Sequence, residues 1–489
     1  MNLSKDNWTY AKVSDFAELL RGISYKKDES RKESQKGYKP ILRSNNINYE
    51  LNFVDLVYVP EKKIKSIQFI KEDDIIFAMS SGSKHLVGKS AQSKRNYDGS
   101  YGAFCGLLRV SNLMNKKYVG LFFKSQEYRK YVSRISKGTN INNLKRDHIL
   151  EINFPLAPLN EQNRIVEKVE ELFSDLDKAT EDLKKSQEQR KIYRQAVLKA
   201  AFEGKLTEKW RKNNPYEKNY LEKIHKSIKN FNFMKTGQDV PRRLPPLDFL
   251  YLPSLPDNWL WMEAHKICTS VRDGTHDTPK YIENGIPLIT SKNLINGKID
   301  FNNIQFISKR DHKEIIKRSF VENDDILFGM IGTIGNPVIV TCKKEFSIKN
   351  VGLFKKSYDY IIPKYLRYWL DSSKLFKILK EKDFIKGTTQ KFISLGNLRI
   401  LPIPLSSLEE QCEIVNEIES RLSVCDKLAE TVQQSLKKIE YLRQSILKKA
   451  FEGNLVPQNP EDEPVEKLLE RIKQEKEKYE SNNKKRKKR

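Results

Sequence analysis

The chain has 489 residues, of which 38% are hydrophobic and 31% are charged, and its formal net charge is +26. This length accommodates two or three domains, and so strong a positive charge favours a polyanionic partner, nucleic acid first among them. The five cysteines form no CxxC pair, which argues against a disulfide framework or a thiolate zinc site.

A lysine-rich surface that merely faces solvent is the alternative explanation of the charge. The tail from Lys484 to Arg489 supplies six of the charges and is expected to be disordered, so most of the charge belongs to the folded part. The N-terminus lacks the apolar core of a signal peptide, and no run of about 18 apolar residues occurs. We therefore expect a cytoplasmic protein without a membrane span.

Residues 1–155 are predicted to form a first α/β domain. In chain order we expect a short helix at Phe16–Leu20, a strand entering a polar turn within Lys36–Ile47, a buried strand at Ile75–Met79, a helix over Tyr118–Ile135 and a strand at Ile149–Leu156. The last of these leads into a long helix.

A long helix is predicted over residues 156–206 and again over residues 405–455. The stretch from Glu161 to Gly204 recurs from Glu410 to Gly453 without a gap, at a constant offset of 249 residues, and both copies end in Ala-Phe-Glu-Gly. Glycine directly after the last helical residue is typical of a C-terminal cap. A helix duplicated at about half the chain length indicates two tandem units.

The second unit repeats the plan of the first in a different sequence. We expect a connector at residues 207–253 and a second α/β domain at residues 254–404. A C-terminal arm with a basic tail is expected at residues 456–489. Trp8 recurs as Trp259 and Ile75 recurs as Ile326, but most loop residues between such matches differ. We therefore expect one shared framework that carries two different sets of loops.

Apolar residues in the long helices recur at alternating steps of four and three, from Ile165 to Ala200 and from Ile414 to Ile446. This spacing is typical of a coiled-coil seam. Because the chain supplies two helices of matched length, we expect an antiparallel intramolecular pair with pseudo-twofold symmetry; pairing with a second chain is the alternative. At about 1.5 Å per residue each helix spans roughly 60 Å, enough to space two domains on neighbouring DNA turns.

No catalytic or metal-ligating residue is predicted. Gly82–Ser90 resembles a P-loop but has five rather than four residues between its glycines, and Asn214-Pro215-Tyr216 lacks the second proline of an adenine methyltransferase motif. The acidic pairs at 73–74 and 324–325 could suggest a metal-dependent nuclease, but acidic residues are common in turns before strands. The six histidines lack metal-ligand spacing.

With its tandem units laid out, the chain resembles the specificity (S) subunits of type I restriction–modification systems over nearly its whole length. The resemblance is carried by PLAPLNEQ and PLSSLEEQ before the long helices, AFEGKLT and AFEGNLV at their ends, and LPDNWLW and DGTHDTPKY in the second domain. Each motif is weak alone, but both copies in this order are specific. The resemblance implies an α+β fold of two tandem α/β target-recognition domains, each followed by a long helix of an antiparallel intramolecular coiled coil.

The resemblance further implies that each domain reads one half of a split, asymmetric site in double-stranded DNA, and that the long helices dock two methyltransferase (M) subunits. Adenine-N6 methylation and ATP-dependent cleavage would belong to the M and restriction (R) subunits, which would bind S-adenosylmethionine, ATP and Mg. This chain would be a non-catalytic subunit without a cofactor of its own.

Polar loop residues are the candidates for DNA contact, because amide, hydroxyl and cationic side chains bond to base edges and phosphates. In the first domain they are Arg43, Ser44, Asn45, Ser81, Lys84, Lys137, Thr139 and Asn140; in the second they are Thr275, His276, Ser291, Lys292, Thr333, Lys386, Thr388, Gln390 and Lys391. The candidates for subunit docking are the matched helix residues Gln162, Arg194, Gln195, Phe202, Gln411, Arg443, Gln444 and Phe451. For any single loop residue, an ordinary turn is the alternative.

Two other functions stay open at this point. The chain could be a stand-alone DNA methyltransferase or nuclease with an unrecognised site, or a basic coiled-coil scaffold that binds nucleic acid nonspecifically. Methyl transfer or cleavage by the chain alone would favour the first, and binding without sequence selectivity would favour the second.

Overall fold

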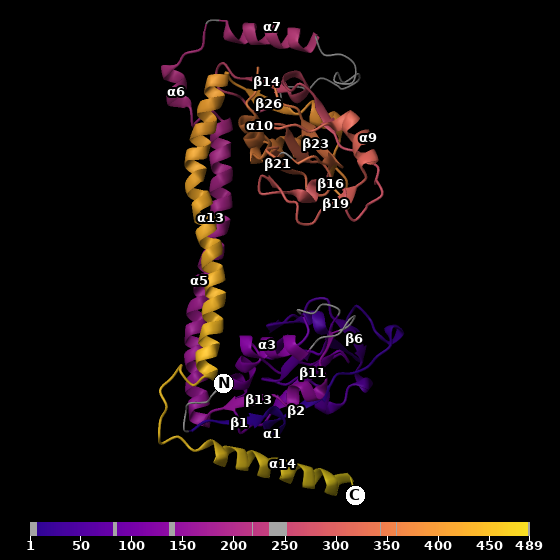
Figure 1. The fold of residues 1–489 in the computed structure, drawn as a ribbon, viewed down its shortest axis with the longest axis vertical. Helices are drawn as coiled ribbons and strands as arrows, with labels where there is room; N and C mark the ends of the chain where they lie inside the picture. Colours follow the sequence, from indigo (N-terminus) through magenta and orange to yellow (C-terminus); the bar gives the residue numbers. More distant parts are fainter. Residues whose placement is uncertain are drawn as a thin grey trace. The chain divides into compact units, whose positions relative to one another are not determined.

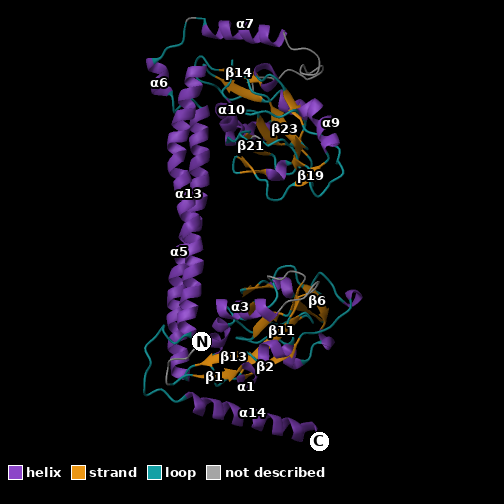
Figure 2. Ribbon diagram, in the orientation of Figure 1, coloured by secondary structure: helices purple, strands orange, loops and turns teal. Residues whose placement is uncertain are grey.

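The computed structural model describes residues 7–81, 86–135, 142–217, 219–233, 252–342, 344–357 and 359–487. The chain folds as two compact units, of which unit 1 comprises residues 1–184 and 433–489, and unit 2 comprises residues 185–432. Each unit holds one α/β domain, a part of each long helix and an arm helix (Figure 1). Figure 2 shows the strands gathered in the domain of each unit.

The domain of unit 1 is built on two sheets. A four-stranded antiparallel sheet has the order β2-β11-β7-β9, and a three-stranded sheet has the order β10-β3-β6 with β10 parallel to β3. These strands are β2 Ala17–Arg21, β3 Tyr38–Leu42, β6 Val57–Pro60, β7 Ile75–Ala78, β9 Ser90–Gln92, β10 Ser100–Tyr101 and β11 Cys105–Val110. Smaller antiparallel pairs join β1 Thr9–Lys12 to β13 Asn153–Leu156, β4 Ile47–Asn48 to β5 Glu50–Leu51, and β8 Ser80–Ser81 to β12 Asn142–Asn143.

Two predicted elements of this domain are confirmed. The strand predicted from Ile75 is β7, whose four residues are all buried. The polar turn after β3 is the 3-10 helix η2, Ser44–Asn46, in which the buried Asn46 side chain accepts from Arg43 N at 2.9 Å and donates to the carbonyls of Asn52 and Val54. Both features follow from local sequence, a β-rich apolar run and a cluster of polar turn residues.

The helices of this domain are α1 Val13–Phe16, α2 Lys116–Phe122, α3 Gln126–Ile135 and α4 Arg146–Leu150.

Three elements predicted for this domain differ in the structure. Residues 17–20 belong to strand β2 rather than to a helix, because their pairing with β11 overrides the helix propensity of the run. The helix predicted over 118–135 is divided into α2 and α3 at Ser125, whose hydroxyl accepts from Tyr128 N. The final strand begins at Asn153, since α4 occupies residues 146–150.

The domain of unit 2 has two sheets with the same strand orders, β15-β23-β20-β21 and β19-β16-β22. The strands are β14 Leu260–Glu263, β15 Val271–Asp273, β16 Ile286–Ile289, β17 Leu294–Ile295, β18 Lys298–Ile299, β19 Gln305–Ile307, β20 Ile326–Gly329, β21 Gly335–Ile339, β22 Ser347–Ile348, β23 Val351–Phe354, β24 Ile385–Lys386, β25 Phe392–Ile393 and β26 Pro402–Leu405. The helices are α6 Glu208–Asn213, α7 Tyr220–Phe233, α8 Ala264–Ile267, α9 Lys309–Ser319, α10 Pro363–Leu370, α11 Ser373–Glu381 and α12 Leu395–Arg399.

The shared framework expected from the sequence is confirmed by these strand orders. In both domains the middle strand of the smaller sheet has one parallel neighbour, β10 beside β3 and β22 beside β16. Buried tyrosines repeat as well, because Tyr118 Oη donates to Pro155 O at 2.9 Å and Tyr365 Oη donates to Pro404 O at 2.8 Å. The domains differ before β7 and β20, where unit 2 has helix α9 and the described residues 61–74 of unit 1 have 3-10 turns.

The long helices are α5 Leu159–Phe202 and α13 Leu408–Phe451. In unit 1 the start of α5 packs with the end of α13, and Ile165, Val169, Leu447 and Phe451 share one buried cluster. In unit 2 the end of α5 packs with the start of α13, where Val197, Phe202, Ile414 and Ile418 share another. The predicted antiparallel intramolecular pairing is therefore confirmed within each unit.

The predicted seam is only partly buried near the C-terminal end of each long helix. Tyr193 and Leu442 were assigned to it, yet they are 46% and 41% exposed, while Leu198 and Ala201 outside the predicted spacing are buried. Near its ends each helix contacts a domain as well as the other helix, so apolar residues on a second face become buried there. Where the two long helices contact only each other, the side chains between them stay partly exposed to solvent.

Each unit also holds an arm helix, which comes after the domain and long helix of the other tandem repeat in the chain. In unit 1 the arm is α14 Val465–Lys487, which buries Val465, Leu468 and Ile472 in the core cluster of the domain. In unit 2 the arm is α7, which contacts α8 and buries Ile228. The predicted disorder of the tail at 484–489 is wrong for residues 484–487, which continue α14, and residues 488–489 lie outside the described residues. Among the described helices, none is long and apolar enough to cross a membrane.

Candidate nucleic-acid interface

In unit 2, hydrogen bonds join the candidate DNA-contacting loops to one another. We call this set of loops the rim of the domain; it contains residues 275–276, 291–292, 330–333, 350 and 386–391. The loop after β20 pairs with the β24–β25 hairpin, because Gly332 N donates to Lys391 O at 2.9 Å and Ile393 N donates to Met330 O at 3.0 Å. The exposed Thr333 and the exposed hairpin side chains therefore occupy adjoining loops. Those hairpin candidates are Lys386, Thr388, Gln390 and Lys391.

Two further loops meet the same rim at Asn350. Asn350 N donates to Thr275 O at 3.1 Å, and Ser291 Oγ donates to Asn350 O at 3.2 Å. Gly329 brings the loop after β20 against them, since a Cβ added there would lie 3.4 Å from the Cβ of Ser291 and 2.4 Å from a loop carbonyl. Ser291 is buried, which leaves the exposed Lys292 as the accessible candidate of its loop.

His276 is held on this rim by two side chains, those of Asp273 and Asn350. Its Nε2 lies 2.8 Å from Asp273 Oδ2, and its Nδ1 lies 3.0 Å from Asn350 Oδ1. The buried Asp273 carboxylate also accepts from Arg318 of α9. The two contacts fix the ring, so the more than half-exposed imidazole is a positioned polar group rather than a freely rotating one.

The corresponding loops of unit 1 meet through serine hydroxyls and a short ladder. Ser44 Oγ donates to Ser80 O at 3.1 Å, Ser81 pairs with Asn142, and Asn45 is exposed. Arg43 Nη2 donates to the carbonyl and carboxylate of Asp55 at 2.7 and 3.0 Å. Its guanidinium is therefore already paired in part. The candidates Lys84, Lys137, Thr139 and Asn140 lie outside the described residues.

Sequence reasoning missed two groups of residues at these rims. Asn46 and Asn293 are buried at 1% and 6% exposure and shape the loops, because their side-chain amides donate to backbone carbonyls across the turn. Their repetition in both units was a usable signal. The second group is the turn between β10 and β11, where Phe104 is 69% exposed, and its counterpart at Asn350. Exposure of that phenylalanine has no sequence signature.

The acidic pairs that could have suggested a nuclease have structural roles. Asp74 accepts from Lys71 N at 2.7 Å and from Arg109 Nε at 2.9 Å, and Asp325 accepts from Glu322 N and Lys355 Nζ, both at 2.7 Å. Burial raises the pKa of the Asp325 carboxyl, and the Lys355 ammonium opposes that rise. Within the described ranges, no group of three or more His, Cys, Asp or Glu residues could hold a metal ion.

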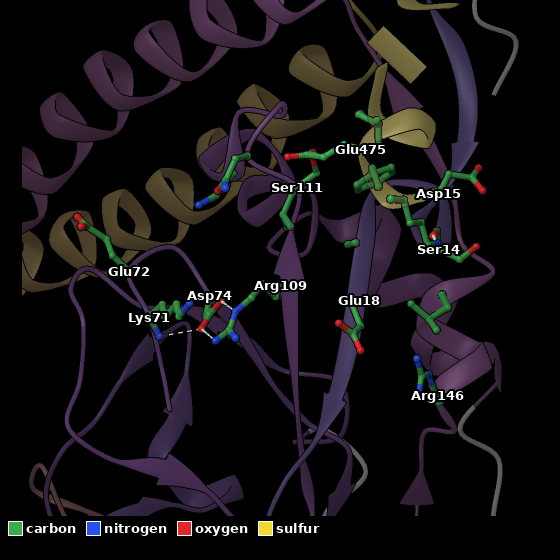
Figure 3. Close-up of a pocket in the computed structure, with 18 residues that line it drawn as sticks. Ser14, Asp15, Glu18, Lys71, Glu72, Asp74, Arg109, Ser111, Arg146 and Glu475 are labelled. Atoms are coloured by element: carbon green, nitrogen blue, oxygen red, sulfur yellow. Dashed lines mark hydrogen bonds and ion pairs between the residues drawn. The ribbon is translucent and has the colours of Figure 1, made fainter. Parts of the chain in front are cut away.

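Unit 1 has a cavity of about 750 Å³. Strands β2 and β11 line it on one side, and the arm helix α14 lines it on the other. Figure 3 shows Asp74 and Arg109 pointing toward each other on one side of it and Glu475 near Ser111 on another. Ser111 Oγ donates to Glu475 at 3.1 Å, and Lys476 Nζ donates to Ser14 O at 3.0 Å. Its charged side chains of both signs thus fasten the arm to the domain, and they do not converge as a catalytic set would.

The docking candidates are engaged mainly within the chain. Gln162 is fully buried, accepts from Asn115 N at 3.0 Å and donates to Ala157 O at 2.8 Å. Gln411 is equally buried, accepts from Ile362 N at 2.9 Å and donates to Tyr360 O at 2.9 Å. Phe202 and Phe451 are core residues. These four side chains join the long helices to the domains; contact with a partner by them stays a prediction.

The remaining docking candidates are half-buried and paired. In unit 2, Arg194 forms an ion pair with Asp371 at 2.9 Å, and Gln195 accepts from Ser373 N at 2.7 Å. In unit 1, Gln444 donates to Lys124 O at 3.4 Å. Arg443 donates to Asp177 of the facing helix at 2.5 Å. Partner contact by these residues is likewise untested and stays a prediction.

Exposed apolar side chains on the same helices were not among the candidates. Ile192 and Tyr193 of unit 2 are 71% and 46% exposed, and Tyr441 and Leu442 of unit 1 are 76% and 41% exposed. The two pairs occupy matched positions, 249 residues apart. Each unit therefore presents the same kind of exposed apolar pair at the same position of a long helix.

Comparison with known proteins gives a consistent family. Residues 5–192 and 256–441 each match the model of the type I restriction modification DNA specificity domain. The chain is 31% identical to the EcoKI specificity subunit of Escherichia coli (strain K12), covering 96% of each sequence, and 31% identical to the StySPI specificity subunit of Salmonella potsdam, covering 97% of each.

A solved structure from a study of assembly and conformational transition in a type I R-M system has a similar fold. The TM-score is 0.60 at 18% sequence identity, over 92% of this chain and 99% of the solved one.

Proposed function

The chain belongs to the family of type I restriction–modification DNA specificity proteins, and from this membership we propose that it is the sequence-specific DNA-binding subunit of a type I complex. In this proposal each recognition domain reads one half of a split site in double-stranded DNA. Because the loop residues of the two domains differ, the two half-sites differ, and the target is asymmetric.

One observation carries the proposal: a single framework is present twice with two different sets of polar loops. The strand orders of the two domains match, yet the rim of unit 2 displays His276, Lys386 and Gln390, whereas that of unit 1 displays Asn45 and Phe104. A duplicated scaffold with divergent rims suits recognition of two unlike sequences. The net charge of +26 favours attraction to the phosphate backbone.

We further propose that two methyltransferase subunits dock on the long helices, one on each matched apolar pair. Ile192 with Tyr193, and Tyr441 with Leu442, offer equivalent surfaces that water would otherwise cover. Restriction subunits would join through that complex. In the same proposal, S-adenosylmethionine, ATP and Mg are bound by the partner subunits, and this chain contributes no catalytic group.

Exchange of the first recognition domain tests the DNA-reading part. Residues 1–155 would be replaced by the corresponding domain of another family member, and the sites methylated by the complex would be mapped by methylation-aware sequencing. The proposal expects one half-site to change while the other persists. A change in both halves, or methyl transfer by the purified chain without any partner, would contradict it.

Paired substitutions test the docking part. Ile192→Ala with Tyr193→Ala should remove one methyltransferase subunit from the complex, and Tyr441→Ala with Leu442→Ala should remove the other. Native mass spectrometry reads the stoichiometry directly. The matched controls are Lys191→Ala and Glu440→Ala, exposed charged residues at corresponding positions, which should leave two subunits bound.

A further inference from the structure

Phe104 is an exposed aromatic side chain on a turn whose backbone is hydrogen-bonded to neighbouring loops. It lies between β10 and β11, and 69% of its surface is exposed. Its carbonyl oxygen accepts from Met79 N at 2.9 Å and from Ser80 N at 3.2 Å, while Gly102 N, two residues earlier, donates to Leu42 O at 2.9 Å. The backbone of the turn is therefore hydrogen-bonded to two neighbouring loops, and it presents the ring to solvent.

The turn lies among the residues proposed to contact DNA. Ser80, whose amide donates to Phe104 O, accepts from Ser44 Oγ through its own carbonyl at 3.1 Å. Ser44 Oγ also lies 4.0 Å from the sulfur of Cys105, the residue after Phe104. The ring thus shares a rim with the loop of Arg43, Ser44 and Asn45.

Unit 2 has a polar residue at the corresponding turn. Its counterpart, between β22 and β23, carries Asn350, which contacts His276 Nδ1 at 3.0 Å through its side chain. The strands on either side are equivalent in the two units, but the turn has three residues (102–104) in unit 1 and two (349–350) in unit 2, and Asn350 has a positive φ of 53°. The two domains therefore present different groups from turns of different shape. A phenyl ring cannot form the hydrogen bonds of an amide, but it can contact the apolar parts of a base.

We propose that Phe104 is a base-contacting, specificity-determining residue of the first recognition domain, which places its ring against an apolar surface of one base in the first half-site. The proposal rests on the DNA-reading function proposed above. Two contacts share this chemistry: the C5-methyl group of a thymine in the major groove, and the face of a base at an opened step. Contact with either surface would remove the exposed phenyl ring from water, and this burial would stabilise the complex.

The experiment selects DNA from a random duplex library with the full chain in its complex, and compares wild type with Phe104→Ala and Phe104→Leu. Truncation to alanine should lower affinity for the wild-type-selected duplex about 10- to 100-fold and erase preference at one or two positions of a single half-site. Affinity for unrelated DNA should not change. Because the side chain is exposed and the backbone bonds remain, the thermal midpoint should match that of wild type.

The leucine variant and modified DNA separate the two contacts. If the ring covers a thymine methyl, leucine retains much of the affinity, and replacing one thymine by uracil lowers wild-type affinity to the level of the alanine variant. If the ring stacks at an opened step, leucine behaves like alanine, uracil has no effect, and 2-aminopurine at that step brightens on binding. Phe320→Ala, an exposed phenylalanine of the other domain, should leave the first half-site unchanged.

Several results would overturn the inference. These are unchanged selection by Phe104→Ala, an equal loss on unrelated DNA, or a loss of partner subunits rather than of DNA selectivity. If the wild-type complex itself selects no bipartite sequence, the proposed function fails and this inference falls with it. If wild type selects such a sequence and Phe104→Ala selects the same one, only the inference fails.

Discussion

The two recognition domains repeat their buried polar contacts and differ at their exposed rims. Asn46 and Asn293 close equivalent turns, and Asp74 and Asp325 occupy equivalent positions before the central strands β7 and β20. A buried polar group that loses its partner destabilises the fold, so contacts of this kind are kept in the two domains. Rim residues lack that constraint. The comparison teaches that recognition can diverge while the framework that presents it is kept.

The anchors of the arms reverse their polarity between the units. In unit 2 the carboxylate is on the long helix, where the fully buried Glu410 accepts from Thr207 Oγ1 at 2.7 Å, from Trp259 Nε1 at 2.8 Å, and from Arg211 and Tyr216 of the connector. In unit 1 the cation is on the helix, where Arg164 donates to Asp462 of the arm at 2.6 and 3.2 Å. The two arms are thus anchored by ion pairs at different helix positions, and unit 1 also has a buried glutamate, Glu161, at the position that matches Glu410.

Glu410→Ala should have the largest effect on this comparison. It leaves the Arg211 guanidinium and the Trp259 indole without their acceptor in the interior, which is expected to cost roughly 3–5 kcal/mol in unit 2. Hydrogen exchange resolved by peptide should show lost protection in residues 207–230 and 254–270, with unit 1 unaffected. Glu409→Ala, an exposed neighbour, is the control. Equal loss of protection in both units would refute the local role.

The buried glutamines offer a symmetrical test. Gln162→Ala removes the partner of a backbone N–H and a carbonyl where a domain meets its long helix, and Gln411→Ala removes the partner of a backbone N–H and two carbonyls. Each should cost about 1–3 kcal/mol in its own unit. Denaturant unfolding followed by hydrogen exchange measures both. If one variant were silent while the other destabilised its unit, the two joints would not be equivalent.

Acid should loosen the arm of unit 1 through Asp462. The Arg164 guanidinium lowers the pKa of that carboxyl, so its contribution is present above the ordinary value and is lost as the pH falls through the lowered one, below about 4. Exchange of residues 465–476 should therefore accelerate on acidification. The hydrogen bond of arm α7, which joins the hydroxyl groups of Ser227 and Tyr360 at 2.9 Å, involves no carboxyl group.

Arg164→Ala supplies the control for that response. It should weaken docking of α14 at neutral pH by about 1–3 kcal/mol and abolish most of the acid dependence. Acid-dependent release that persisted in this variant would assign the effect to other carboxylates of the arm.

Arg109→Lys should have the smallest effect, and it makes unit 1 resemble unit 2. Arg109 bonds to Asp74 and also donates to the carbonyls of Ile67 and Phe69 at 2.9 and 3.0 Å, whereas Lys355 occupies the corresponding place beside Asp325. A lysine cannot reproduce the planar fork, so a loss of about 1 kcal/mol is expected in thermal or denaturant unfolding. A neutral result would mean that the two carbonyls are satisfied without the guanidinium.

The local sequence was enough for elements that depend on nearby residues. The buried strand at Ile75, the turn at Ser44–Asn46 and the long helices that end before Gly204 and Gly453 follow from composition, turn chemistry and caps. Residues 17–20 were wrongly predicted as a helix, because the pairing with β11 that makes them a strand involves residues about 90 positions away. The site was less predictable, since hydrogen bonds across distant loops set which side chains are exposed.

The sequence by itself determined the duplication, the two long helices and the tandem domains, because repeats and periodic apolar residues are read without knowing any contact. The family followed from the resemblance of motifs such as PLAPLNEQ and AFEGKLT to those of known specificity subunits. Only the tertiary structure decided that each arm joins the unit of the other domain, that Gln162 and Gln411 are interior joints, and that Phe104 projects outward. These outcomes depend on which surfaces meet. Burial is a property of the assembled contacts rather than of a residue and its neighbours in the chain.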